Sequence, residues 1–209
     1  MLGRLPPAEP DRAGGPPGQG MREVWETVRA IVVAVVIALL LRTFVIETFQ
    51  VQGFSMEPTL QNGERLLVNK VALHLTPPHI GQIIVFRPPL PASPALVAAG
   101  IAEASCEYTP DPPVDFVKRV IALGGDTVDM RDGQVYIDGV LQPEPFLPPV
   151  WRDTFTSPTP VTIPSGDVFV LGDHRAASED SRCFGPVPIS RIVGVVQLIW
   201  WPLADARVL

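Results

Sequence analysis

The sequence predicts a mainly β protein, in which an antiparallel β domain follows one N-terminal transmembrane helix. Two observations carry this prediction. Proline makes up 25 of the 209 residues and is spread along the chain, and because proline is excluded from helix interiors and central strands, a mostly helical fold is unfavourable. A single uniformly apolar segment lies near the N-terminus, and short runs rich in valine, isoleucine and leucine follow it.

The N-terminal region divides into a tail and an anchor. Residues 1–20 are rich in proline, glycine and arginine without an apolar period, which predicts a disordered tail. Residues 21–46 are predicted to form a transmembrane anchor, because Ala30–Leu41 reads AIVVAVVIALLL and its flanks extend it toward the ~20 residues that a bilayer requires. A buried core helix is one alternative. A cleaved signal peptide is another, but it requires small residues after the apolar run, and bulky ones stand there.

The arginines before this segment predict its orientation. Since positive residues favour the cytoplasmic side, the N-terminus is expected in the cytoplasm and the rest of the chain outside the cytoplasmic membrane. The arginines in question are Arg4, Arg12, Arg22 and Arg29.

Residues 47–209 are predicted to form the β domain. Asp132-Gly133 is typical of a two-residue hairpin turn within 127–138. The proline- and alanine-rich segment 88–115 is expected to be a surface insertion, and 141–165, with its many prolines, is expected to be loop. Strands are predicted at Val45–Gln52, Arg65–Val71, Gln82–Arg87, Phe116–Leu123, Thr127–Asp138, Val168–Leu171 and Ile192–Trp200.

Composition excludes several classes of partner. The formal net charge is −6 and no lysine/arginine cluster is present, so a nucleic-acid partner is not expected. The two cysteines, Cys106 and Cys183, lack C-x-x-C spacing, which gives no support to a zinc or thioredoxin-like site. They form either one disulfide or two free thiols. No metal or organic cofactor is predicted.

Three polar segments are candidates for chemistry. Ser55 lies in Val51–Leu60, where Gly53 permits an unusual backbone angle; a serine in such a loop is by itself most often a turn residue. Lys118 interrupts an apolar run and either faces solvent or is buried. If it is buried beside a serine, its pKa falls and the neutral amine can accept the hydroxyl proton. A carboxylate paired with that amine would argue against this role. The third segment is the polar loop 172–187.

Together these segments resemble bacterial type I signal peptidase. The resemblance rests on four blocks in the same order: G-F-S-M-E-P-T-L, G-Q-I-I-V-F-R-P, K-R-V-I-A-L-G-G-D and G-D-H-R-A-A-S-E-D-S-R-C-F-G-P-V-P. It covers roughly residues 30–200. The resemblance implies a membrane-anchored serine endopeptidase that removes signal peptides from exported preproteins, with small residues preferred at the first and third positions before the cut. Preprotein signal peptides, the lipid bilayer and export machinery are the implied partners.

The resemblance also assigns roles to individual residues. Ser55 aligns with the nucleophile and, through its backbone N–H, with an oxyanion donor; Lys118 aligns with the general base. Ser178 aligns with a hydroxyl that orients the lysine. Asp180 and Arg182 align with a structural ion pair, and Gly172 and Asp173 with the start of the same loop.

Three positions depart from the commonest family pattern. Gly53 stands where some members have a serine that helps to bind the oxyanion, so the second oxyanion donor is open. His174 stands where asparagine is usual, and Gly124 where proline is usual.

Rival functions differ in the residues that they need. A Ser/His/Asp hydrolase would use His174 with Asp173 or Asp180. A self-cleaving repressor-type protease would need a DNA-binding helical domain before the serine. A membrane-tethered module that binds peptides without cleaving them would leave Ser55 and Lys118 unused.

Overall fold

The structure, a computed structural model, describes residues 19–88, 114–157 and 159–209, with side chains described from 22 and not at 40–44. The predicted tail at 1–20 and most of the predicted insertion at 88–115 therefore lie outside the described residues, as does Cys106. The chain forms two compact units, Met1–Arg42 and Thr43–Leu209, and each is considered by itself.

A long helix, α1 (Gln19–Phe44), occupies the first unit. Its described side chains are exposed, and many of them are large and apolar, including Trp25, Ile31 and Leu39. Across the described part of the chain, no helix has the length and apolarity needed to cross a membrane.

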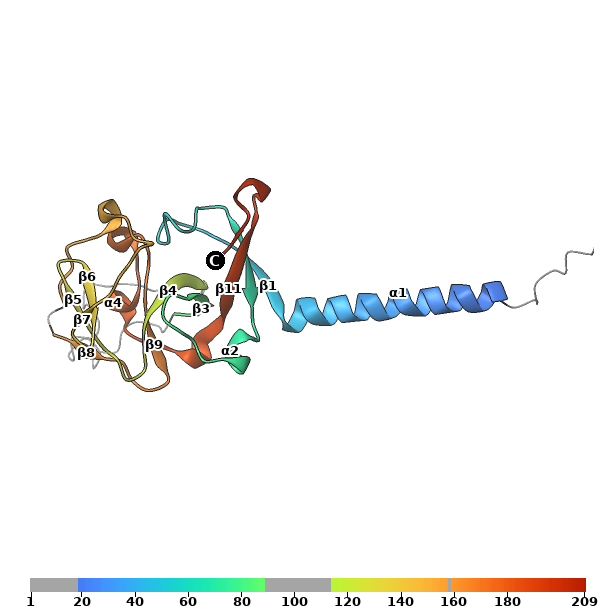
Figure 1. The fold of residues 1–209 in the computed structure, drawn as a ribbon, viewed down its shortest axis with the longest axis horizontal. Coiled ribbons are helices and arrows are strands. Elements are labelled where there is room, and N and C mark those ends of the chain that lie inside the picture. The colour runs from blue at the N-terminus through green and yellow to red at the C-terminus, as the bar shows by residue number, and fades with distance from the viewer. Residues whose placement is uncertain (1–18, 89–113, 158) are drawn as a thin grey trace, which may run out of the picture. The chain divides into compact units, whose positions relative to one another are not determined.

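The second unit is mainly β, as predicted, and contains two antiparallel sheets (Figure 1). The larger sheet has eight strands in the order β1-β2-β11-β3-β4-β9-β10, with β12 paired to β11. Its strands are β1 (Ile46–Gln50), β2 (Arg65–Asn69), β3 (Ile83–Phe86), β4 (Phe116–Leu123), β9 (Asp167–Leu171), β10 (Val187–Pro188), β11 (Ile192–Trp201) and β12 (Arg207–Val208).

The smaller sheet has four strands in the order β7-β6-β5-β8. They are β5 (Thr127–Arg131), β6 (Gln134–Ile137), β7 (Val140–Leu141) and β8 (Val161–Thr162). Figure 1 shows this sheet beside β4 and β9 and away from β1 and β11. Short helices connect the strands: α2 (Ala72–Leu75), α4 (Ser181–Phe184), and the 3-10 turns η1 (Pro149–Trp151), η2 (Arg175–Ala177), η3 (Ile189–Arg191) and η4 (Leu203–Asp205).

The predicted hairpin is confirmed, and the predicted loop at 141–165 is partly wrong. Asp132 and Gly133 both adopt positive φ, at 49° and 72°, as a two-residue turn between β5 and β6 requires. Residues 161–162 of the proline-rich segment form β8 by pairing with β5. A two-residue strand carries too short an apolar pattern to be recognised from the sequence.

Buried side chains join the two sheets. One cluster combines Ile121 and Ala122 of β4 and Leu171 of β9 with Val128 and Met130 of β5. The central strands β3, β4 and β9 are buried over most of their length. Burial of valine and leucine side chains contributes roughly 1.5–3 kcal/mol each. The strand that carries Lys118 is therefore held firmly from both sides.

Candidate active site

Ser55 lies in the loop between β1 and β2. Met56 and Leu60, which follow it, are buried in the core. The Glu57 N–H donates to the Phe54 carbonyl at 3.1 Å, and the Leu60 N–H to the Met56 carbonyl at 2.9 Å. The turn that carries Ser55 is thus anchored by buried side chains on its C-terminal side.

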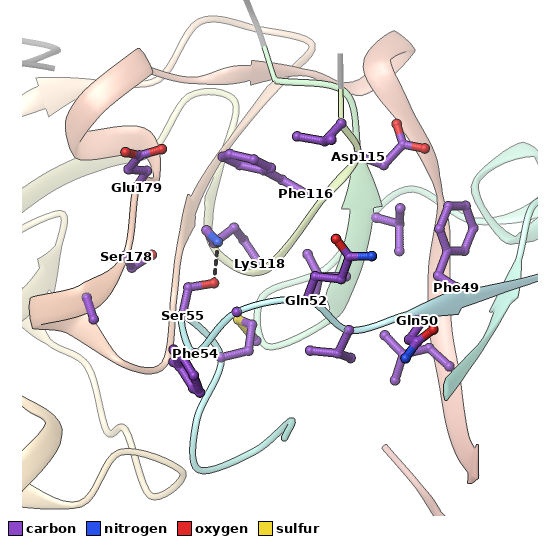
Figure 2. A pocket seen from close by; sticks show the side chains of 18 of the residues that line it. Phe49, Gln50, Gln52, Phe54, Ser55, Asp115, Phe116, Lys118, Ser178 and Glu179 are labelled. Atoms are coloured by element: carbon purple, nitrogen blue, oxygen red, sulfur yellow. Dashed lines mark hydrogen bonds between the residues drawn. The ribbon is translucent and has the colours of Figure 1, made fainter. Parts of the chain in front are cut away.

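Lys118 lies in the middle of β4, between β3 and β9. Its side chain is buried, with 4% of the residue exposed. The Lys118 Nζ and Ser55 Oγ atoms are 2.7 Å apart and hydrogen-bonded (Figure 2). The structure therefore brings together two residues that are 63 positions apart in the chain.

The surroundings of Lys118 favour its neutral form. Burial lowers the pKa of its amine to about 8, and the charges of Asp180, Glu179 and Asp173 only partly oppose this effect. The nearest aromatic ring is that of Phe116, whose centroid lies 4.9 Å from Nζ. Within the described residues, Lys118 forms no ion pair with a carboxylate. This arrangement suits a base that must be neutral to accept a proton.

Gly172 lets the polar loop approach Ser55. A Cβ atom at this position would overlap the Ser55 carbonyl oxygen and the side chain of Ser178. Two residues later, the His174 N–H donates to the same Ser55 carbonyl at 3.0 Å. The end of β9 and the nucleophile loop are therefore in direct backbone contact, which only glycine at position 172 permits.

Ser178 lies in the same groove as Ser55 and Lys118. Its Oγ is buried, and among the described residues no hydrogen bond joins it to Lys118. The hydrogen bond to Lys118 that the resemblance implies is thus not formed in this structure. Ser178 is close to the site, but its orienting role stays a prediction.

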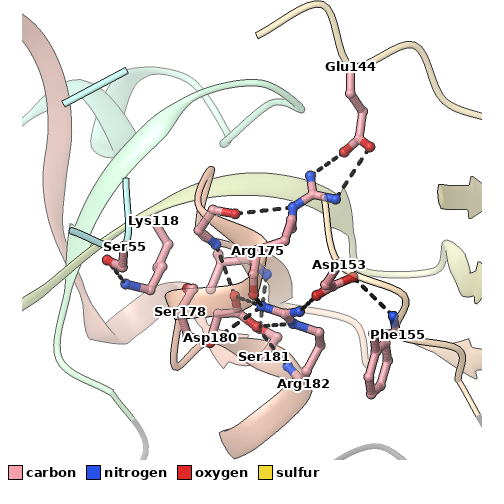
Figure 3. Close-up of polar contacts among 12 residues, drawn as sticks. Ser55, Lys118, Glu144, Asp153, Phe155, Arg175, Ser178, Asp180, Ser181 and Arg182 are labelled. Atoms are coloured by element: carbon pink, nitrogen blue, oxygen red, sulfur yellow. Dashed lines mark hydrogen bonds and ion pairs between the residues drawn. The ribbon is translucent and has the colours of Figure 1, made fainter. Parts of the chain in front are cut away.

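Asp180 and Arg182 form a buried ion pair behind the site (Figure 3). Arg182 Nε and Nη2 each donate to the Asp180 carboxylate at 2.8 Å. The same carboxylate accepts the Gly172 N–H at 3.0 Å and caps α4 through the Arg182 N–H. Burial alone would raise the pKa of Asp180, but the Arg182 guanidinium and these hydrogen bonds outweigh it, so the pKa lies below its usual value.

Three further charged residues complete this network. Arg175 is fully buried, donates from Nε to the Gly172 carbonyl at 3.1 Å, and pairs with Glu144. Arg182 pairs with Asp153 and also donates to the Arg175 carbonyl at 2.7 Å. Glu144 and Asp153 come from the segment between β7 and β8, so that segment is tied to the loop carrying Ser178 (Figure 3).

Asp173 and His174 do not form a triad with Ser55. The Asp173 carboxylate accepts from Arg119 Nε at 2.9 Å and from Nη2 at 2.7 Å. The His174 ring packs edge-on against Trp151, with centroids 4.0 Å apart. Among the described residues, neither Asp173 nor Asp180 bonds to the His174 ring, so the geometry gives no support to a Ser/His/Asp hydrolase.

Gly53 adopts the unusual backbone conformation that the sequence allowed for at this position. Its φ is +92°, which side chains with a Cβ rarely adopt. Its N–H donates to Asn62 Oδ1 at 3.1 Å. This hydrogen bond occupies the Gly53 amide, whereas the Ser55 N–H has no acceptor among the described residues.

A groove of about 790 Å³ runs past the Ser55–Lys118 pair. We call it the Ser55 groove. Its lining includes the apolar side chains of Phe49, Val51 and Met56 and, from the polar loop, Ala177 and Ser178. The groove is large enough for several residues of an extended peptide.

Several residues of the network were missed in the sequence. Arg119 follows Lys118 in a buried strand, and since neighbouring residues point to opposite faces, two consecutive basic residues there signal two separate buried partners. Arg175 lies inside the recognised loop and carried no separate signal. Glu144 and Asp153 lie in the segment expected to be loop, where an acidic residue is ordinarily solvated.

Cys183 is disulfide-bonded and buried within α4, next to Arg182. The alternative of a free thiol at Cys183 is therefore wrong. Disulfides persist in oxidising compartments.

A serine hydroxyl bonded to a buried lysine, beside a peptide-sized groove on an antiparallel β scaffold, defines the class of serine peptidases. The family model described as signal peptidase, peptidase S26, matches residues 24–201. The chain belongs to this family and is a serine endopeptidase.

Relatives in sequence agree with this assignment. A probable signal peptidase I-1 from Synechocystis is 42% identical, over 85% of this chain and 82% of that protein. A signal peptidase I from Bacillus licheniformis is 34% identical, over 88% of this chain and 92% of that one. The crystal structure of a signal peptidase I from Enterococcus faecalis is 30% identical, with a TM-score of 0.42 over 57% of this chain and 97% of that chain.

Proposed function

We propose that this signal peptidase cleaves signal peptides from exported preproteins with Ser55 as nucleophile and Lys118 as general base. The observation that carries the proposal is the 2.7 Å contact between Lys118 Nζ and Ser55 Oγ. Removal of signal peptides is the activity of the family to which the chain belongs. The assignment of roles rests on the geometry of the two side chains.

The reaction begins when Ser55 Oγ attacks the scissile carbonyl and neutral Lys118 takes the hydroxyl proton. The Ser55 N–H stabilises the oxyanion, and one such donor is worth roughly 2.7–4 kcal/mol. Lys118 then gives its proton to the leaving amine. A water molecule, deprotonated by Lys118, then attacks the acyl group, and Lys118 returns this proton to Ser55 Oγ as the acyl–oxygen bond breaks. The backbone N–H of Gly53 already donates to Asn62 Oδ1, so it is a poor candidate for the second oxyanion donor.

The Ser55 groove supports an extended peptide as the substrate. An extended segment exposes alternate side chains on one face, so the first and third residues before the cut point the same way. Small residues at both positions, as the resemblance implies, would let the backbone approach Ser55.

The location of the enzyme is a separate part of the proposal. We propose that residues 21–46 anchor the chain in the cytoplasmic membrane, with the N-terminus in the cytoplasm and the catalytic unit outside. The exposed apolar side chains of α1 support contact with lipid. Resistance of the full-length protein to alkaline extraction from membranes would test the anchor, and release into the supernatant would contradict it.

The catalytic proposal is tested with full-length protein in detergent and a preprotein that carries an Ala-x-Ala site. The variants are Ser55→Ala, Lys118→Ala and His174→Ala, and cleavage is read by N-terminal sequencing of the product. We expect wild type and His174→Ala to cleave after the second alanine, and both other variants to lose more than about 10³-fold in kcat.

Two outcomes would contradict the proposed roles. Cleavage that survives in Lys118→Ala but not in His174→Ala would restore the Ser/His/Asp mechanism. Binding of the preprotein without any turnover by the wild type would indicate a peptide-binding module.

A further inference from the structure

The Ser55 groove carries an unbalanced charge. Of its described lining residues only Asp115, Lys118 and Glu179 are ionisable with a charge near neutral pH, and the others are apolar or neutral polar residues. Lys118 is buried and bonded to Ser55. The charges that a bound peptide meets at the surface of this groove are therefore both negative.

The two carboxylates differ in their partners. Asp115 lies 3.5 Å from Arg87, which offsets its charge. Glu179 is exposed, and its carboxylate has no ion pair or hydrogen bond among the described residues. An unpaired carboxylate at the edge of a binding groove is free to interact with a charge on the ligand.

The backbone on both sides of Glu179 is held in place. Its neighbour Asp180 is fully buried in the pair with Arg182, and Arg182 Nη2 also donates to the Ser178 carbonyl at 3.4 Å. Figure 2 shows Glu179 on the Ser178 side of the Lys118 amine, whereas Asp115 lies on the other side, toward Phe49. Glu179 thus has a defined place next to the reacting pair.

The charge of Glu179 also acts on the amine of Lys118. Burial lowers the pKa of Lys118 to about 8, while the carboxylates of Asp180, Glu179 and Asp173 oppose that shift and Arg182 adds to it. The Glu179 charge is therefore felt at the atom that takes the proton from Ser55. A charge on a peptide bound between them would be felt at Glu179 as well.

We propose that Glu179 determines the charge preference of the cleavage site, so that a peptide with a basic residue at one position near the scissile bond is cleaved in preference to one with an acidic residue there. This inference rests on the proposed function, because it takes the Ser55 groove as the place where the preprotein binds. The interaction is partly solvated, so a roughly two- to fivefold preference in kcat/KM is expected.

A charge swap tests the proposal. The substrates are peptides with one Ala-x-Ala site, identical except that four positions, the middle residue of this site and the first three residues after the cut, are changed in turn to lysine, glutamine or glutamate. The enzymes are full-length wild type, Glu179→Gln and Glu179→Lys. Asp205→Lys, which changes an exposed carboxylate of η4 that does not line the groove, is the matched control.

At one substrate position we expect the wild type and Asp205→Lys to prefer lysine, Glu179→Gln to show no preference, and Glu179→Lys to prefer glutamate. The kcat/KM of Glu179→Gln on the neutral peptide should also reach its plateau at a lower pH, because one of the charges that raise the pKa of Lys118 is gone. A purely structural role for Glu179 would change neither property.

An unchanged order of preference in Glu179→Gln at all four positions would overturn the proposal, as would a reversal produced by Asp115→Lys instead. If Glu179→Lys does not fold, the glutamine variant decides the matter alone. The failure of this proposal can be distinguished from failure of the proposed function. If wild type cleaves the neutral peptide and Ser55→Ala does not, the proposed function is supported, whatever the charge preference is.

Discussion

At the residue scale, the site depends on a lysine kept neutral by burial. Lys118 is one of only two lysines in the chain, and apolar strands surround it. The other, Lys70, pairs with Glu47 at the surface, where the Nζ–Oε2 distance is 3.2 Å. The same residue type therefore serves two purposes, and exposure to water decides which.

The activity should follow the ionisation of Lys118. Since its pKa is lowered to about 8, the neutral form is the minor one below that pH. We expect kcat/KM to rise about tenfold per pH unit below pH 8 and then to level off. A pH–rate profile gives the apparent pKa at which kcat/KM levels off. An apparent pKa near 6 would instead indicate a histidine base.

Replacing Lys118 should stabilise the protein at neutral pH. The unfolded chain holds this proton up to pH 10.5 and the folded chain releases it near 8, so folding carries a penalty of about 3 kcal/mol at pH 7. The penalty is complete below pH 8 and vanishes above 10.5. Lys118→Met should therefore unfold at higher urea than wild type at pH 7, with a smaller difference at pH 10. Lys70→Met is the control and should shift stability by less than about 1 kcal/mol. An equal gain at both pH values would contradict this account.

At the element scale, the close approach of two loops positions the nucleophile. The loop after β9 contacts the Ser55 carbonyl through Gly172 and the His174 N–H. Both loops lie outside the strand ladders of the two sheets. Their mutual packing, with α4 behind them, defines where Ser55 lies relative to β4.

Gly172→Ala tests this packing. The added Cβ would overlap the Ser55 carbonyl oxygen and Ser178, and overpacking of this kind typically costs about 1–3 kcal/mol. We expect a loss of kcat of at least tenfold with a smaller change in KM, because the Ser55–Lys118 contact is displaced. Steady-state kinetics and a melting curve measure both effects. Gly139→Ala is the control: no atom lies within 4 Å of its added Cβ, although its positive φ imposes some strain. Full activity in Gly172→Ala would show that the loops tolerate separation.

At the scale of the whole catalytic unit, buried ion pairs connect the segment between β7 and β8 to the site. Arg175 with Glu144 and Arg182 with Asp153 make these connections. Such pairs add little net stability when intact, but removing one partner leaves an uncompensated buried charge. The smaller sheet and its loops therefore contribute to the order of the site without lining the groove.

Glu144→Gln should destabilise the unit more than its distance from the reaction suggests. Arg175 is fully buried and would lose its counter-charge, at a cost of about 3–5 kcal/mol. Glu47→Gln removes the carboxylate from the solvated ion pair with Lys70 and is the matched control, with an expected cost below about 1 kcal/mol. Urea unfolding compares the two. Equal effects would contradict the role of burial.

Much of this arrangement was predictable because it depends on local patterns. The apolar run of β4 and the Asp132-Gly133 turn follow from strand periodicity and turn chemistry, and both agree with the structure. The short β8 was missed because its pairing with β5, rather than its own pattern, makes it a strand. The ionic partners Glu144 and Asp153 were missed for the same reason, since their burial depends on chain segments far away in sequence.

The sequence by itself determined the β class of the catalytic unit, the family resemblance and the candidacy of Ser55 and Lys118, because periodicity and motif order are properties of neighbouring residues. Only the tertiary structure decided whether Lys118 was buried or solvated, that Asp173 pairs with Arg119 rather than with His174, and that the Gly53 amide is engaged by Asn62. Burial and ion pairing depend on which distant segments the fold brings together, and the pKa of a lysine depends on burial.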